Sequence, residues 1–367
     1  MNQPEYDQLM SIGWTPALEQ EFIARHGTTF VPGRVIRGGS RGCLLCTAAG
    51  DVPAVVTGGF EYRAAVASDL PTVGDWVAAE PSEASGAPYR IHAVLPRRTT
   101  VSRKRAGNEN TEQVLAANVD VVFIVLSCER DRTLSPRAVE RYLTMVRAGG
   151  AKPVLLLNKV DLTADPEAAV ARVIVAADGV QCFTTSAVSG AGTADLSEAL
   201  SGSRTGVLVG PSGTGKSSLI NRLRGEPLQA TAPVRGVDLK GRHTTTSREL
   251  IHVPGGGLLI DTPGIRELQL WADEDDLAES FSDIGELSQG CRFRDCSHSG
   301  EPGCAVHSAL MEGRLDQARY ENYLELRREL AYLKRRTEER AQFDTKDRWK
   351  QIHRQMRNFT KEKRAGG

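Results

Sequence analysis

The chain has 367 residues, 40% of them hydrophobic and 25% charged, with 46 Lys and Arg balanced by 46 Asp and Glu. This composition is typical of a globular protein, and the length argues against a single domain, because one core rarely exceeds about 250–300 residues. Residues 1–20 lack the basic and apolar regions of a signal peptide, and the longest apolar run, 119–126, is too short to span a membrane. We therefore expect a cytoplasmic protein with no membrane partner.

Short strands are predicted near the beginning of the chain. Residues 1–30 are polar with scattered apolar positions, and we expect an N-terminal extension that contains some helix. Across residues 31–105, segments rich in β-branched residues alternate with turns of Gly, Pro, Asp and Ser. The clearest segments are 33–37, 54–57, 74–78 and 90–94. This spacing predicts a small barrel, for which an OB-like barrel is the preferred interpretation and an SH3-like barrel the main alternative.

Longer apolar runs across residues 106–272 predict a buried parallel sheet. The runs cover 119–126, 153–157, 206–209 and 257–260. Near-continuous apolar strands suit a sheet that is covered by helices on both faces. A helix is predicted over 135–148, with Ser135 as its N-cap and Pro136 at its first position. These features together predict a doubly wound α/β domain.

A phosphate-binding loop follows the predicted strand at 206–209. Residues Gly210-Pro211-Ser212-Gly213-Thr214-Gly215-Lys216-Ser217 match the pattern G-x-x-x-x-G-K-[ST]. The glycines let successive backbone N–H groups point at phosphates without side-chain obstruction. We expect Lys216 to neutralise the β- and γ-phosphates during catalysis and the Ser217 hydroxyl to bind Mg²⁺.

A guanine-reading motif lies upstream of this loop, which is the reverse of the usual order. Asn158-Lys159-Val160-Asp161 has the form N-K-x-D, in which the carboxylate accepts both N1–H and N2–H₂ of guanine. We expect Asn158 to bridge the base and the phosphate loop, and the backbone of Ser186 and Ala187 to meet guanine O6. The alternative is a simple turn after a buried strand. Together, the motifs predict a circularly permuted domain that binds GTP or GDP.

The remaining switch elements are predicted downstream of the phosphate loop. Asp261-Thr262-Pro263-Gly264 fits D-x-x-G, in which Asp261 holds Mg²⁺ through water and the Gly264 N–H senses the γ-phosphate. Thr245 is the preferred Mg²⁺ ligand of switch I, with Thr244 and Thr246 left open. His243 is a candidate for orienting the attacking water, although a surface or phosphate-contact role is equally open. Ile265 stands where a catalytic glutamine often follows D-x-x-G, so intrinsic hydrolysis is expected to be slow.

A cysteine and histidine cluster predicts a zinc site in residues 273–340. Its expected ligands are Cys291, Cys296, His298 and Cys304, a set that can close a tetrahedral structural site, with His307 as a spare candidate. Cys43 and Cys46 lack a second pair and are interpreted as part of a plain strand. A helix is expected from about residue 315, followed by a basic tail over 341–367. From residue 327 to the end there are 14 Lys and Arg against 6 Asp and Glu, which suits either a polyanion partner or a solvated helix.

With these motifs in order, the chain resembles the family of ribosome small-subunit-dependent GTPases called RsgA, or YjeQ-like. The resemblance rests on the ordered nucleotide motifs, on Val73-Gly74-Asp75-Trp76-Val77, on the segment 241–246 and on the Cys-x4-Cys-x-His-x5-Cys cluster. It implies a multidomain α/β protein with an N-terminal OB barrel, a circularly permuted P-loop GTPase domain and a C-terminal zinc domain with helices. It also implies binding to the 30S ribosomal subunit and its 16S rRNA late in maturation, with GTP hydrolysis stimulated by the subunit.

Two other classes of function remain as alternatives. One is a zinc and OB RNA-binding adaptor in which GTP only stabilises or regulates the fold. The other is an ATP-using P-loop kinase, which Asp161 disfavours because adenine offers no matching pair of donors. For all of these interpretations we expect a monomer.

Overall fold

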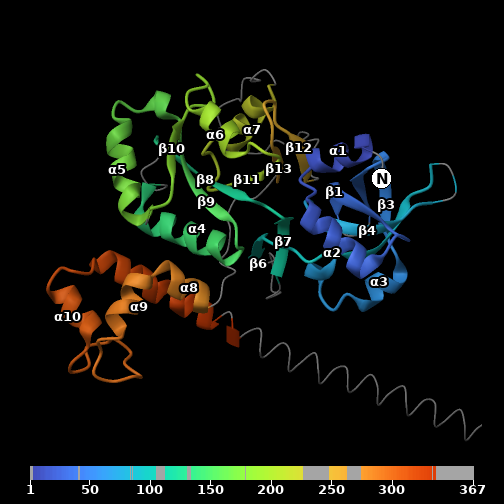
Figure 1. Cartoon of the computed structure of the whole chain (residues 1–367). Helices are drawn as coiled ribbons and strands as arrows, with labels where there is room; N and C mark the ends of the chain where they lie inside the picture. Colours follow the sequence, from blue (N-terminus) through green and yellow to red (C-terminus); the bar gives the residue numbers. More distant parts are fainter. Residues whose placement is uncertain are drawn as a thin grey trace, which may run out of the picture.

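The computed structural model describes residues 3–39, 42–82, 84, 86–104, 112–129, 134–177, 179–225, 248–262, 274–332 and 334–335. Figure 1 shows three neighbouring regions: a barrel at the beginning of the chain, a helix-covered sheet in the middle and a group of helices near the end. The basic tail expected over 341–367 lies outside the described residues. Among the described residues, no helix is long and apolar enough to cross a membrane.

The N-terminal extension forms two helices that complete the core of the barrel. Helix α1 (Gln3–Ser11) is followed by α2 (Pro16–His26), which begins at a Thr15 cap with Pro16 in its first turn. Leu9, Leu18 and Phe22 on these helices are buried, and the centroid of the Trp14 ring lies 4.7 Å from that of Trp76 in the barrel. The extension is therefore packed onto the barrel.

Five strands close the barrel in OB order. The strands are β1 (Val31–Gly39), β2 (Gly42–Thr47), β3 (Gly50–Val56), β4 (Trp76–Glu80) and β5 (Tyr89–Val94). They pair in the order β1-β2-β3-β5-β4, and β4 returns to β1, so the sheet has no free edge there. Strands β3 and β5 are parallel, and α3 (Gly58–Arg63) and the short η1 (Ala67–Asp69) fill the connection from β3 to β4. This order confirms the OB-like barrel over the SH3-like alternative, and the predicted strand at Cys43 and Cys46 is β2.

A hairpin connects the barrel to the central sheet. Strand β6 (Thr100–Lys104) pairs antiparallel with β7 (Glu112–Ala117). The expected domain boundary between residues 105 and 106 falls between these two paired strands. The hairpin and the barrel meet closely, because a Cβ on Gly74, whose φ is +94°, would lie 2.0 Å from the Ala117 carbonyl oxygen. Only glycine fits at this point of the Val73–Val77 segment.

In the part of the central domain that the structure describes, six strands form a doubly wound sheet. Strands β8 (Val121–Ser127), β9 (Lys152–Asn158), β10 (Cys182–Thr185), β11 (Thr205–Val209) and β13 (Leu258–Asp261) are parallel, and β12 (Glu249–His252) is antiparallel to β13. Their order is β10-β9-β8-β11-β13-β12. Between them run α4 (Pro136–Ala148), α5 (Pro166–Ala177), α6 (Thr193–Ala199) and α7 (Lys216–Arg224). Ser135 accepts a hydrogen bond from the Ala138 N–H at 3.3 Å, so the predicted helix cap is confirmed.

Alternate residues of β8 pack into two different cores, which explains its unbroken apolar run. Val122, Ile124 and Leu126 belong to the core shared with α4 and α5. Val121, Phe123 and Val125 belong to a second core shared with α6 and α7. Figure 1 shows these two pairs of helices on opposite sides of the sheet. A strand buried on both faces needs apolar residues at every position.

The barrel and the central sheet are joined edge to edge. Strand β12 pairs with β1, with Arg37 opposite Glu249, so one continuous sheet runs from the nucleotide motifs into the barrel. At the join, the buried Arg34 donates hydrogen bonds to the carbonyl oxygens of Ile12, Gly74 and Asn118 and to the Thr205 hydroxyl. One side chain thereby connects the extension, the barrel and the central domain. Burial lowers the pKa of Arg34 to about 10, which leaves the guanidinium charged at neutral pH.

Replacing Arg34 with Met should lower the free energy of unfolding by about 3–5 kcal/mol, because several buried carbonyl groups lose their donor at once. The matched control is Arg37→Met on the same strand, whose partly exposed pair with Glu249 should contribute only about 0–1 kcal/mol. Urea unfolding followed by tryptophan fluorescence measures both, since Trp14 and Trp76 lie at the join. If Arg34→Met lowered the free energy of unfolding no more than Arg37→Met does, Arg34 would not be what holds the extension, the barrel and the central domain together.

The C-terminal helices pack against α4 of the central domain. They are α8 (Glu274–Ser280), α9 (Ser282–Ser288), α10 (Ala305–Met311) and a helix over 317–332. The Arg319 guanidinium contacts the buried Glu140 on α4 at 2.6 Å and Asp283 on α9 at 2.7 Å, and lies over the Phe281 ring. Burial raises the pKa of Glu140, while Arg319 and Asn322 act in the opposite direction. The pair from Arg141 to Glu329 adds a second link at 2.7 Å.

Candidate nucleotide and metal sites

The phosphate-binding loop lies at the carboxyl end of β11, directly before α7. Gly210 has a φ of +138°, and a Cβ there would lie 2.3 Å from the Val125 carbonyl oxygen, so the loop passes closely over the end of β8. Gly215 has a φ of +92°, and a Cβ on it would lie 2.2 Å from the Asn158 amide nitrogen. Both positions require glycine for close backbone approach. The loop thus leads into the N-terminus of a nine-residue helix, an arrangement that fits phosphates.

Asn158 connects three of the motifs that the sequence places far apart. Its amide nitrogen donates to the Thr214 carbonyl oxygen at 2.8 Å. Its amide oxygen accepts from the Thr185 hydroxyl and from the Ala187 N–H, both at 3.3 Å. Asn158 is itself buried at the end of β9, beside Thr185 at the end of β10. The base-reading segment, the loop and residues 185–187 therefore converge at the carboxyl edge of the sheet.

The other residues of the base-reading segment form the rim of this site. Lys159 has a φ of +66°, and its ammonium group pairs with Glu129 at 2.7 Å. Val160 and Asp161 lie in the short turn η3 (Val160–Leu162), where the Asp161 side chain is exposed. Ser186 and Ala187 are both buried. The Asp161 carboxylate is therefore accessible to a ligand from solvent, whereas residues 186 and 187 are covered.

Lys216 is the first residue of α7 and is held by the loop itself. Its ammonium group donates to the carbonyl oxygens of Gly210 and Pro211, both at 2.7 Å. Burial lowers the pKa of Lys216 to about 8. Ser217 follows on the same turn with an exposed side chain. The ammonium group is therefore held against the first two residues of the loop, while the Ser217 side chain is open to solvent.

Asp261, at the end of β13, has charged neighbours that the sequence motifs do not reveal. Arg224, the last residue of α7, lies 3.9 Å from its carboxylate and 3.7 Å from that of Glu249. Glu249 is directly opposite Asp261 on β12 and also pairs with Arg37 of the barrel. Burial raises the pKa of Asp261, Arg224 lowers it and Glu249 raises it further. Arg37 on the barrel edge is thus connected to Asp261 through Glu249 and Arg224, which carry alternating charges.

Several predicted switch residues lie outside the described part of the chain. They are His243 and Thr245, their neighbours Thr244 and Thr246, and also Gly264 and Ile265. The described chain resumes at Arg248, whose guanidinium donates to the Thr72 hydroxyl and the Val114 carbonyl oxygen, both at 3.3 Å. Arg248 itself is therefore held between the segment before β4 and strand β7.

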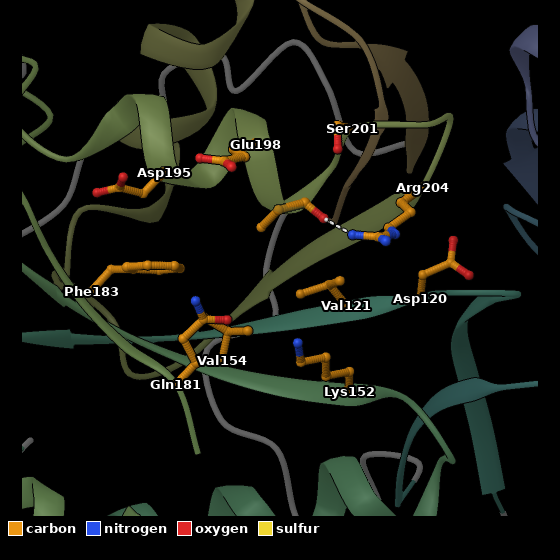
Figure 2. Close-up of a pocket in the computed structure, with 11 residues that line it drawn as sticks. Asp120, Val121, Lys152, Val154, Gln181, Phe183, Asp195, Glu198, Ser201 and Arg204 are labelled. Carbon is orange, nitrogen blue, oxygen red and sulfur yellow. Dashed lines mark hydrogen bonds between the residues drawn. The ribbon is translucent and has the colours of Figure 1, made fainter. Parts of the chain in front are cut away.

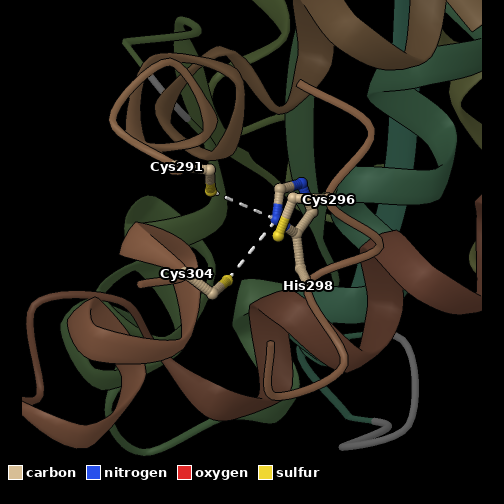
Figure 3. A group of neighbouring side chains, drawn as sticks. All are labelled: Cys291, Cys296, His298 and Cys304. Carbon is tan, nitrogen blue, oxygen red and sulfur yellow. Dashed lines mark hydrogen bonds between the residues drawn. The ribbon is translucent and has the colours of Figure 1, made fainter. Parts of the chain in front are cut away.

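The four predicted zinc ligands come together in the C-terminal region (Figure 3). The ligand atoms of Cys291, Cys296, His298 and Cys304 all lie within 4.8 Å of one another. His298 Nδ1 lies 3.5 Å from the Cys291 sulfur and 3.6 Å from the Cys304 sulfur. Tetrahedral zinc, with Zn–S near about 2.3 Å and Zn–N near about 2.0–2.1 Å, requires S to N separations of about 3.5–3.6 Å. The cluster therefore fits one closed zinc site, with His298 and not His307 among the four residues.

A separate cavity of about 540 Å³ lies at the opposite, amino end of the sheet (Figure 2). Its lining combines carboxylates, cations and a partly apolar floor: Asp120, Lys152, Phe183, Asp195, Glu198 and Arg204 are prominent. Arg204 is held to the Ala199 carbonyl oxygen at 3.3 Å. Since the phosphate loop and Asn158 lie at the carboxyl ends of the strands, this amino-end cavity is not the nucleotide site.

Fold and site together define a circularly permuted P-loop GTPase with an OB barrel and a C-terminal cluster of three cysteines and one histidine. A family model described as RsgA GTPase matches residues 94–271. A small ribosomal subunit biogenesis GTPase RsgA from Opitutus terrae is 45% identical over 95% of this chain and 97% of its own length. A relative of the same name from Syntrophotalea carbinolica is 40% identical, over 96% and 98% of the two chains.

Solved structures agree with these sequence relationships. The crystal structure of YjeQ from Thermotoga maritima superposes with a TM-score of 0.60 at 27% identity, over 82% of this chain and 98% of that one. The circularly permuted GTPase YloQ gives a TM-score of 0.57 at 25% identity, over 84% and 97%. The chain belongs to the RsgA GTPase family and is a GTP-hydrolysing enzyme. The ATP-using kinase alternative is thereby wrong.

Proposed function

We propose that this GTPase binds the 30S ribosomal subunit during its late maturation and that the subunit stimulates its GTP hydrolysis. The observation that carries the proposal is similarity along nearly the whole chain, over 95% of its length, to a protein named for small ribosomal subunit biogenesis. Coverage of this extent takes in the barrel and the Cys/His cluster as well as the GTPase domain, which supports extending the proposal to the whole chain. OB barrels and zinc modules are both common RNA-binding units, which supports contact with 16S rRNA.

The nucleotide residues have separate roles in the proposed reaction. Asp161 accepts the two guanine donors, and Asn158 keeps the base segment and the phosphate loop in register through its contacts with Thr214 and Ala187. The backbone N–H groups of residues 210–217, apart from Pro211, which has none, surround the phosphates, and Lys216 neutralises charge on the transferred group. When bound, Mg²⁺ would supply further charge neutralisation, with Ser217 and Thr245 as ligands and Asp261 holding it through water. Gly264 is the proposed sensor of the γ-phosphate, and His243 the proposed residue that orients water.

The four-residue cluster is proposed to hold one structural zinc ion. Cys291, Cys296, His298 and Cys304 exhaust its tetrahedral coordination, so no open position remains for catalysis. The ion would fix the conformation of the 291–304 segment beside the C-terminal helices. We further propose that the enzyme acts as a cytoplasmic monomer.

Affinity for the 30S subunit in different nucleotide states separates an active switch from an RNA adaptor. If the nucleotide controls binding, 30S affinity with a non-hydrolysable GTP analogue should exceed that with GDP by at least about tenfold. The reason is that a nucleotide can control subunit binding only if the GTP-bound and GDP-bound proteins have different affinities for the subunit. Sedimentation with purified subunits measures both, with 50S subunits as the control. Equal affinities in the two states would favour the adaptor in which GTP is only structural.

A further inference from the structure

An exposed aromatic side chain lies between two zinc ligands. In the Cys291–Cys296 segment, Arg292, Phe293 and Arg294 are consecutive and all exposed, and the Phe293 side chain is 45% exposed. Single exposed apolar residues are common on protein surfaces and need no explanation by themselves. This one differs in its neighbours, because a guanidinium group lies on either side of it in the sequence.

The backbone that carries Phe293 is held at both ends. Cys291 and Cys296 both belong to the proposed zinc cluster, so a bound ion would close the intervening four residues into a short loop. The Arg292 N–H donates to the Gly303 carbonyl oxygen at 3.0 Å, and a Cβ on Gly303 would lie only 3.0 Å from the Arg292 Cβ. Directly after Cys296, the Glu301 carboxylate accepts hydrogen bonds from the N–H groups of Ser297 and Ser299, both at 2.8 Å, and so fixes the backbone that follows the loop. A ring on a rigid loop can bind a flat partner with little loss of conformational entropy.

The charges around the ring favour a nucleic acid as the partner. The Arg292 guanidinium carbon lies 5.6 Å from the Phe293 ring centroid, and Arg294 offers a second exposed cation directly after the ring. The next residue, Asp295, is a single exposed acid, so the two cations outnumber it on this loop. Arginine pairs with phosphate and stacks on flat rings, while an exposed aromatic ring stacks on any unpaired base. A hydrophobic protein partner would be matched better by a wider apolar patch than by one ring between two cations.

We propose that Phe293 is a base-stacking platform that receives an unpaired RNA base of the small ribosomal subunit, with Arg292 and Arg294 contacting the neighbouring phosphates. This assignment rests on the proposed function, because it names the RNA contact through which the zinc region binds the subunit. Stacking of this kind tolerates any base, so the platform contributes affinity and position without reading a sequence.

Replacing Phe293 with Ala should weaken 30S binding about 5- to 100-fold, the range expected when one base loses its aromatic partner. Phe293→Trp should keep the affinity within a few-fold of the wild type, because the stacking surface is retained. The matched control is Met311→Ala, which removes another exposed apolar side chain, 77% exposed, from α10 of the same region. In all three variants the zinc content and the GTPase rate without subunits should remain at wild-type values.

The chemical nature of the partner is tested with a photoreactive residue at the same position. Phe293→p-benzoylphenylalanine in complex with 30S subunits should crosslink to 16S rRNA. Crosslinks only to ribosomal proteins, or wild-type affinity for Phe293→Ala, would overturn the platform while leaving the proposed function intact. Absence of 30S binding by the wild-type protein would instead overturn both.

Discussion

Replacing Lys216 with Ala is expected to lower kcat/KM for GTP hydrolysis by about a thousandfold, the size of effect seen when one preorganised charge is removed from a transition state. The side chain lies at the mouth of the phosphate loop, where the carbonyl oxygens of Gly210 and Pro211 hold its ammonium group at 2.7 Å. An alanine methyl group reaches no phosphate and carries no charge. Single-turnover hydrolysis of GTP by the purified protein measures the effect.

The matched control is Lys152→Ala in the same domain. Lys152 begins β9 and lines the amino-end cavity, at the opposite end of the sheet from the phosphate loop. Its loss should leave hydrolysis within about twofold of the wild type, because a solvent-screened charge this far away contributes little. Comparable losses in the two variants, or full activity in Lys216→Ala, would refute the assignment of the loop as the catalytic phosphate site.

Replacing Cys296 with Ser is expected to abolish stoichiometric zinc binding and to release the 291–304 segment. Structural zinc contributes about 10–16 kcal/mol of apparent binding free energy in small zinc modules, so amide exchange in this segment should accelerate by at least about a hundredfold. The surrounding helices should survive, since Phe281, Ile284 and Val306 lie in the buried core that these helices share with the rest of the protein. Metal analysis and hydrogen exchange measure the two effects separately.

Cys43→Ser is the matched control for the zinc prediction. Cys43 lies on β2 in the barrel, where the structure pairs it with Ala54 and no metal cluster is found among the described residues around it. This variant should retain zinc and normal exchange in the 291–304 segment. Full zinc content in Cys296→Ser would show that the ligand set has been assigned incorrectly.

Local patterns were sufficient to predict most of the secondary structure and the permuted order of the motifs. The unbroken apolar run of β8 predicted a strand buried on two faces, and the Ser135-Pro136 pair predicted the start of α4. The convergence of Cys291, Cys296, His298 and Cys304 was also predictable, because their close spacing in one short segment favours it. Signals of this kind depend on neighbours in the sequence.

Features made by distant segments could not be predicted in this way. Nothing near Arg34 in the sequence shows that it will contact Asn118 and Thr205, 84 and 171 positions away. The pairing of β1 with β12, which joins the barrel to the central sheet, likewise depends on the edges that the two sheets present after folding. Arg224 was missed beside Asp261 for the same reason, since only the packing of α7 on β13 brings it there.

The GTPase rate in the presence of different ribosomal components tests the central claim most directly. Purified 30S subunits should raise kcat at least about a hundredfold over the free enzyme, because the partner completes a transition-state environment that the isolated protein lacks. Purified 50S subunits and naked 16S rRNA should give much smaller increases at the same concentrations. No stimulation by 30S subunits, or equal stimulation by 50S subunits, would contradict the account.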